Sequence, residues 1–253
     1  MPAPLRLRPG VHVVVRDADH VQVGLDPPAR VIVARRPEVA RVLERLTAGL
    51  PPAPTTPEGA AVVRDLAAAD LLVVPETPPT GVVRLISRGL DLGPLGVLLE
   101  DAGLTLTRTD PLPDLYVVAS PGPLPRAVLD GWVGEGAPHL VVAGTSRPGG
   151  LRVGPLVEPG TTACLRCVDA HEATHDPRRP VLVEQLAALP AAPVDRRVVA
   201  LATAWAARDA VDFLAGQRPA TWSATVDLDR PSPLVRTWDR HPHCGCGWDD
   251  VPY

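Results

Sequence analysis

The chain has 253 residues, of which 45% are hydrophobic and 21% are charged, a balance typical of a soluble globular protein. Its formal net charge of -4 excludes a general attraction to nucleic acid, and no apolar run is long enough to span a membrane. All 25 basic residues are arginine, which excludes the lysine chemistry of Schiff bases and P-loops.

The first 80 residues alternate apolar and polar side chains and then change to a helical pattern. We expect three short strands at residues 11–15, 21–25 and 31–33. A helix is expected from Pro37 to a stop at Gly49, and a second one from an N-cap at Thr56. The apolar residues of the first helix share one face: Val39, Val42, Leu43 and Leu46. These elements predict a winged-helix-like domain over residues 1–78, with a proline-rich linker at 75–79.

From Gly81 onward the predicted strands are apolar on both faces. We expect strands at residues 82–86, 115–119 and 140–143 and helices at 94–102 and 123–133. Strands of this kind belong to a sheet that is covered on both sides, so residues 81–253 are predicted to form a Rossmann-type α/β domain. In its first helix, we expect Leu95, Leu98 and Leu99 to face inward.

The C-terminal third is expected to contain a turn region at residues 154–160, an alanine-rich helix over 194–214 and a hairpin of strands 221–228 and 234–238. In the helix, four residues recur at helical spacing and are predicted to be core: Val198, Leu201, Ala202 and Trp205. The same helix could pair two copies of the chain as a homodimer. The hairpin is expected to bring the last two cysteines to the first two.

Two short-spaced cysteine pairs, Cys164 with Cys167 and Cys244 with Cys246, predict a tetrathiolate zinc site. Two disulfides are the alternative, but the N-terminus has no signal-peptide pattern, so we expect a reducing cytoplasmic setting. His241 or His243 could replace one cysteine as a ligand. Four thiolates leave no open coordination position, so the predicted zinc is structural, pinning the tail to the domain.

Three segments carry a family resemblance: residues 154–167 (GPLVEPGTTACLRC), 175–180 (HDPRRP) and 241–246 (HPHCGC). They resemble the ThiF-type, ubiquitin-activating-enzyme-like superfamily. More narrowly, they look like its branch of leader-peptide-binding or cyclodehydratase-partner proteins of thiazole/oxazole-modified peptide pathways. The resemblance implies that the four cysteines hold a structural zinc. It also implies that the N-terminal unit is similar to a PqqD-like peptide-recognition domain.

Active members of this superfamily adenylate a carboxylate with ATP and magnesium, using a glycine-rich loop after the first strand. Here that loop carries Gly89, Gly93 and Gly96, but Asp91 stands where a glycine is expected and would repel phosphate. The resemblance gives Asp110 the ribose contact. A tight turn without nucleotide is the alternative reading of these glycines.

Further parts of the adenylating set are missing. The strand at residues 115–119 ends in Ser120, Pro121 and Gly122, where the family has a magnesium-associated aspartate, and no cysteine is free for a thioester. Arg178 and Arg179 lie where the family has a related segment; they could bind a carboxylate or be solvated loop residues. We expect His171 and His175 to be polar surface residues rather than ligands.

These observations predict a non-catalytic, zinc-containing protein that holds a precursor (leader) peptide or a protein partner for a modifying enzyme such as a YcaO-type cyclodehydratase. Strand addition at the edge of the first sheet would bind the peptide, with the helix from Pro37 as a groove wall. Residues 1–80 hold nine arginines and nine acidic residues, so DNA ranks below peptide as a partner. The alternatives are an ATP-dependent adenylating enzyme acting on a peptide or carrier-protein carboxylate, and a stand-alone scaffold.

Overall fold

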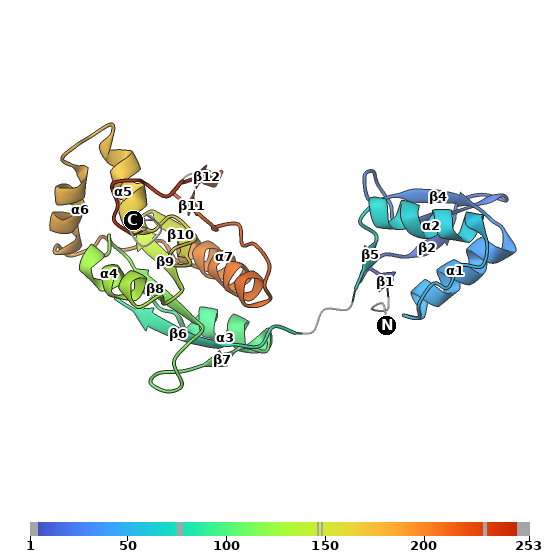
Figure 1. Ribbon diagram of the computed structural model, residues 1–253, viewed down its shortest axis with the longest axis horizontal. Helices are drawn as coiled ribbons and strands as arrows, with labels where there is room; N and C mark the ends of the chain where they lie inside the picture. Colours follow the sequence, from blue (N-terminus) through green and yellow to red (C-terminus); the bar gives the residue numbers. More distant parts are fainter. Residues whose placement is uncertain (1–4, 75–77, 146, 148, 230–231, 247–253) are drawn as a thin grey trace, which may run out of the picture. The chain divides into compact units, whose positions relative to one another are not determined.

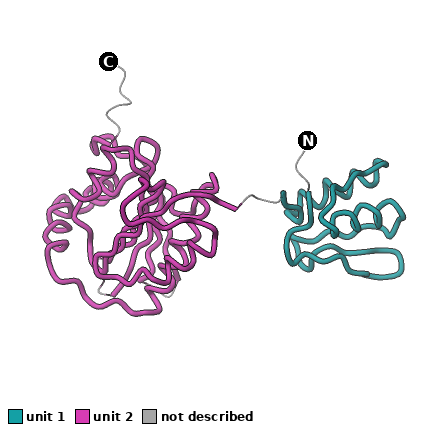
Figure 2. The backbone as a smooth tube through the Cα atoms, turned by 90° about the horizontal axis from the view of Figure 1, so that it is seen from below, with its two compact units in different colours: residues 1–77 teal, residues 78–253 magenta. Residues whose placement is uncertain are grey.

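The computed structural model describes residues 5–74, 78–145, 147, 149–229 and 232–246. Its chain forms two compact units, Met1–Thr77 and Pro78–Tyr253 (Figure 2), each of which is described by itself. Of the predicted linker, residues 75–77 lie outside the described residues, and Pro78 and Pro79 have no regular secondary structure.

The first unit consists of short strands and two helices. The elements are β1 (Arg6–Leu7), β2 (Val13–Val15), β3 (His20–Val23), β4 (Val31–Ala34), α1 (Pro37–Thr47), α2 (Pro57–Ala68) and β5 (Leu72–Val73). Strands β2, β3 and β4 form an antiparallel sheet in that order, and β1 pairs with β5. The predicted strands and helices are thus confirmed, while β1 and β5 are too short for an alternation signal. A third helix, which a winged helix would add, is absent from the described part of this unit.

The sequence determines where both helices begin and which face they bury. All four apolar residues predicted for one face of α1 are buried in the core of the unit. At α2, the side chain of Thr56 accepts a hydrogen bond of 3.2 Å from the backbone N–H of Gly59, and Pro57 occupies the first turn. The N-cap predicted at Thr56 is therefore confirmed.

The second unit is built on a seven-stranded mixed sheet of Rossmann-like type (Figure 1). Its order is β12-β11-β10-β9-β8-β6-β7, where β6 (Val82–Ser87), β7 (Thr105–Leu106), β8 (Leu115–Ser120) and β9 (His139–Gly144) are parallel. The antiparallel strands are β10 (Leu151–Val157), β11 (Ala224–Asp227) and β12 (Leu234–Thr237). Neighbours on both sides of β6 come later in the chain, so the carboxyl end of β6 is a topological switch point.

Helices cover both faces of this sheet. On one face, α3 (Gly93–Asp101) and α7 (Arg196–Leu214) pack on a core that includes Val117 and Leu140. On the other, α4 (Arg126–Gly134) and α5 (Leu165–Ala173) pack on the neighbouring residues Val118 and Val141, with α6 (Arg179–Ala187) beside α5. Successive residues of one strand thus enter different cores, as the apolar runs predicted.

Three expectations for this unit are wrong. Leu98 and Leu201 are 42% and 57% exposed, because they lie on the outer sides of the paired helices α3 and α7. Most of the predicted turn region at residues 154–160 belongs to β10, which bulges between Val153 and Leu156. At this bulge the backbone of Gly154 packs closely against β11, which only glycine allows, because its φ is +90° and a Cβ there would lie 2.4 Å from the carbonyl oxygen of Ala224.

None of the described helices has the length and apolarity that a bilayer-spanning segment needs.

Candidate metal centre and binding sites

The four cysteines meet at the N-terminus of α5. Cys164 is the N-cap of that helix and Cys167 lies in its first turn, while Cys244 and Cys246 follow β12. Their sulfur atoms all lie within 4.8 Å of one another, and none is in a disulfide. The Sγ–Sγ distance is 3.4 Å from Cys164 to Cys244 and 3.8 Å from Cys164 to Cys167.

This donor set fits a tetrahedral metal ion. Four sulfurs placed about 2.3 Å from a zinc ion form a tetrahedron with edges of about 3.8 Å, close to the spacing found here. Hydrogen bonding with Cys164 and then Cys244 lowers the pKa of Cys167, whereas hydrogen bonding with Cys167 and then Cys244 raises the pKa of Cys164. A divalent cation would favour the thiolate form of all four. The cluster could therefore bind a metal ion.

The β11–β12 hairpin brings the second cysteine pair to this position, as predicted. The backbone N–H of Trp238 donates to the carbonyl of Ser223, and the indole Nε1 donates to Thr225 Oγ1 at 3.0 Å. On the other side, Nε2 of His171 in α5 lies 2.9 Å from the carbonyl oxygen of Asp239. His171 thus has a role that the sequence reading missed, as an anchor for the tail.

The predicted nucleotide loop follows β6 and leads into α3. The carboxylate of Asp91 accepts a hydrogen bond of 2.9 Å from the backbone N–H of Gly93, the first residue of the helix. This carboxylate lies where a phosphate would bind a helix N-terminus. Gly96 faces the sheet, and a Cβ there would lie 3.1 Å from the Leu106 side chain, as expected of the packing glycine in such a loop.

A hollow of about 510 Å³ lies beside this loop, between α3 and β7. Gly93, Gly96 and Arg108 line it, whereas Gly89, Asp91 and Asp110 do not. Asp110 uses its carbonyl to accept a hydrogen bond of 2.9 Å from Thr107 Oγ1. The structure thus brings together only part of the residue set predicted for the nucleotide.

The loop after β8 closes on itself. Ser120 is buried, and its hydroxyl accepts a hydrogen bond of 3.3 Å from the N–H of Gly122. Pro121 is packed between the loop after β6 and the end of β9, since a Cβ on Gly144 would lie 2.2 Å from the carbonyl oxygen of Pro121. A serine engaged in its own turn replaces the aspartate that the resemblance places here.

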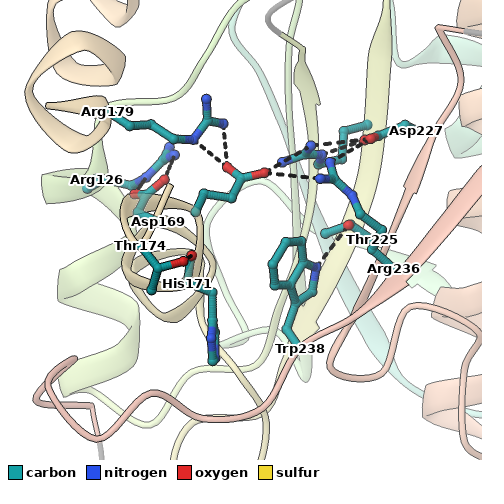
Figure 3. Close-up of polar contacts among 11 residues, drawn as sticks. Arg126, Asp169, His171, Thr174, Arg179, Thr225, Asp227, Arg236 and Trp238 are labelled. Atoms are coloured by element: carbon teal, nitrogen blue, oxygen red, sulfur yellow. Dashed lines mark hydrogen bonds and ion pairs between the residues drawn. The ribbon is translucent and has the colours of Figure 1, made fainter. Parts of the chain in front are cut away.

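A network of ion pairs joins α5, α6 and the antiparallel strands (Figure 3). The carboxylate of Glu172 lies 3.6 Å from Arg152 and 3.4 Å from Arg236, and it also pairs with Arg179. Asp227 accepts from Arg152 Nε at 2.5 Å and from Arg236 Nη2 at 2.7 Å. Burial raises the pKa of Asp227, but the hydrogen bond and charge of Arg152 outweigh it, so its pKa is below the ordinary value.

Of the two predicted arginines in this region, Arg179 belongs to the network and Arg178 does not. The backbone N–H of Arg178 donates to Asp176 at the start of α6. His175 lies beyond the end of α5, and it lines a polar cavity of about 380 Å³ together with Arg179. Sequence reasoning missed Arg152, Glu172 and Arg236, because nothing in their spacing relates residues of three different elements.

The first unit has an apolar groove of about 390 Å³ between its sheet and α1. Val13 of β2, Val21 of β3 and Leu43 of α1 contribute to its walls, with Arg35 and Glu44 among the lining residues. Val15, at the end of β2, is 65% exposed. An apolar hollow beside an exposed strand is a surface that can take an extended chain.

Comparison with known proteins shows which fold this is. No family model matches the chain, and no curated protein matches it. Solved structures do. A heterocyclase in complex with substrate and cofactor has 17% identity and a TM-score of 0.70, over 98% of this chain and 40% of that one. The heterocyclase TruD has 19% identity and a TM-score of 0.66, over 97% and 43%.

A third similar structure is E. coli MccB with MccA-N7isoASN, at 14% identity and a TM-score of 0.60, over 96% of this chain and 99% of MccB. The chain therefore spans about two fifths of the length of the heterocyclase chains and nearly all of MccB. At these identities the likeness concerns the fold, which the chain shares across both of its units.

Proposed function

We propose that this chain binds a precursor peptide through its first unit and presents it to a separate modifying enzyme, without catalysing a reaction itself. The observation that carries this proposal is the apolar groove beside β2. We further propose that the first unit is the PqqD-like, winged-helix-related unit that the sequence suggests. The structures of MccB with MccA-N7isoASN and of a heterocyclase with substrate share the fold, which supports a role in binding a peptide.

The backbone of β2 supplies the binding edge. Gly24 N–H donates to His12 O and Arg16 N–H to His20 O, so these pairs, and Val14 with Gln22 between them, form the hydrogen-bonded pairs of the β2–β3 ladder. The intervening residues Val13 and Val15 consequently direct their N–H and C=O groups away from β3. Among the described residues, no strand pairs with this outer edge. An added strand would bond to Val13 and Val15 and place alternate side chains over the groove.

The partner enzyme is inferred from the structures that share the fold. This chain aligns with two fifths of two heterocyclase chains, and we propose that a heterocycle-forming enzyme acts on the peptide that this chain holds. A cyclodehydratase of the YcaO type is the partner we propose.

We also propose that the four cysteines hold one structural zinc ion, which would fix the C-terminal tail to α5 and take no part in chemistry.

Peptide binding is tested with fluorescently labelled precursor peptides encoded beside this gene, titrated against the full chain and followed by anisotropy. We expect saturable binding that weakens about tenfold or more in Ala40→Trp, because the indole fills the groove, and in Val15→Pro, which removes an edge N–H. Ala67→Trp, at an exposed position of α2, is the matched control and should bind normally. Absence of saturable binding, or equal binding by Ala40→Trp and Ala67→Trp, would reject the peptide role and favour a scaffold.

A second candidate function is ATP-dependent adenylation of a peptide or carrier-protein carboxylate. The hollow beside Gly93 and Gly96 favours it, whereas the Asp91 carboxylate on Gly93 N–H and the serine at position 120 disfavour it. We expect pyrophosphate exchange with ATP, magnesium and peptide to stay at background. Exchange above background that Asp110→Asn abolishes would instead establish the adenylating enzyme.

A further inference from the structure

A strained serine lies between the two segments that carry the cysteines. Ser223, in the turn before β11, has a φ of +48°. Among the described residues of the second unit, it is the only one other than glycine with a positive φ. Such a conformation is unfavourable for serine and persists only where the surrounding structure holds it. Strained residues of this kind cluster at functional sites, so the contacts of Ser223 indicate what the strain serves.

Ser223 bonds to both cysteine-bearing segments. Its hydroxyl accepts a hydrogen bond of 2.9 Å from the backbone N–H of Ala163, which directly precedes Cys164. Its carbonyl accepts a bond of 2.7 Å from the N–H of Trp238, the residue that follows β12 and begins the tail leading to Cys244. Because both bonds meet at one residue, they fix the start of α5 and the C-terminal tail relative to each other.

The turn that carries Ser223 is anchored in the core. The buried carboxylate of Asp209, in α7, accepts hydrogen bonds from the N–H of Thr221 at 2.9 Å and from its Oγ1 at 2.6 Å. The N–H of Ala224 donates to the carbonyl of Thr221 at 3.1 Å, which closes the turn around Ser223. These contacts hold the left-handed conformation and give the Ser223 hydroxyl a fixed position.

The segment that receives this hydroxyl is also fixed. Thr162 is 1% exposed, and its Oγ1 accepts a bond of 2.8 Å from the N–H of Glu158. Ala163 is fully buried, so its N–H would lose its partner if the hydroxyl of Ser223 were removed. The position of the cysteine that follows Ala163 therefore depends on this one bond.

We propose that Ser223 is a positioning residue for the metal centre, which holds Cys164 and the C-terminal tail at the spacing that a tetrahedral ion requires. The inference rests on the proposed zinc site, whose ligands are the four cysteines. Groups that orient metal ligands without touching the metal typically change its affinity about 10–100-fold when they are removed.

The experiment compares the zinc affinity of the full wild-type chain with that of Ser223→Ala and Ser223→Gly, by competition with a chromophoric chelator. Both variants lack the hydroxyl, but glycine adopts the left-handed φ without strain. We expect both to bind zinc about tenfold more weakly. The matched control is Ser120→Ala, which also removes a hydroxyl that accepts a backbone N–H, from Gly122 at 3.3 Å. Ser120 ends β8 at the opposite end of the sheet from Cys164, so this variant should bind zinc normally.

Melting temperatures with and without zinc separate positioning from general stability. A purely structural contact would lower the Tm of the metal-free and the zinc-loaded protein equally. Loss of positioning should instead narrow the difference between the two, because a weaker ligand stabilises the folded state less. Wild-type affinity in either Ser223 variant, or the same loss in Ser120→Ala, would overturn the proposal. A wild-type chain that binds no zinc would refute the metal site as well, so the two failures are distinguishable.

Discussion

Replacing Cys167 with serine is expected to abolish metal binding and to destabilise the second unit. Cys167 is fully buried and its sulfur lies 3.4 Å from that of Cys246, so a serine would leave three thiolates and a hydroxyl that coordinates zinc poorly. Wild-type protein purified under reducing conditions should hold one zinc per chain by mass spectrometry of the metal. The variant should hold none.

The expected loss of stability follows from the length of chain that the metal closes. Cys164 and Cys244 are 80 residues apart, and a cross-link over a loop of this length stabilises a protein by about 4 kcal/mol. For a unit of this size, that loss should lower the Tm by about 8–16 °C. Chelation of the wild-type metal should produce the same shift, measured by calorimetry.

The control for this experiment is His243→Ala. His243 neighbours the cluster in sequence and was one of two histidines that could have served as a ligand, but the four sulfurs already complete a tetrahedron. We expect this variant to keep its zinc and its Tm. Loss of metal from His243→Ala, or retention of one zinc per chain in Cys167→Ser, would contradict the tetrathiolate assignment.

The sequence predicted the structure best where the repeat or spacing of residues follows directly from the way an element packs. The alternation of the last two strands predicted the β11–β12 hairpin, which explains how residues 80 positions apart come to share one cluster. The face of α1 was predicted for the same reason, because a helix that packs on one side repeats its apolar residues at a fixed interval.

Where packing is two-sided, the sequence was less informative. Helix α6 buries Val183 but exposes Val181, Leu182 and Leu186, so its apolar residues show no single face and the helix was missed. Leu98 was predicted to face inward with Leu95 and Leu99, yet of these three leucines only Leu95 and Leu99 are buried. The ion-pair network could not be predicted, because its members are brought together only by the strand order of the sheet.

A buried ion pair between α4 and α5 supplies the second large prediction. Arg126 donates to Asp169 from Nε at 2.6 Å and from Nη2 at 2.8 Å, and both side chains are less than 10% exposed. Arg126→Met should destabilise the unit by about 3–5 kcal/mol, measured by urea unfolding, because the Asp169 carboxylate would stay buried without a partner. The double variant Arg126→Met/Asp169→Leu should recover most of that loss, because neither charge remains.

An exposed pair in the same helices provides the matched control. Arg166 donates to Asp130 through two bonds of 2.6 Å, a bidentate geometry like that of the buried pair, but these side chains are 48% and 42% exposed. Arg166→Met should therefore cost no more than about 1 kcal/mol, since water solvates the remaining carboxylate. Equal losses for Arg126→Met and Arg166→Met would show that burial does not set the strength of these contacts. Recovery in the double variant would show that the buried pair adds little net stability over a pair of apolar side chains, whereas a loss as large as that of Arg126→Met would contradict this account.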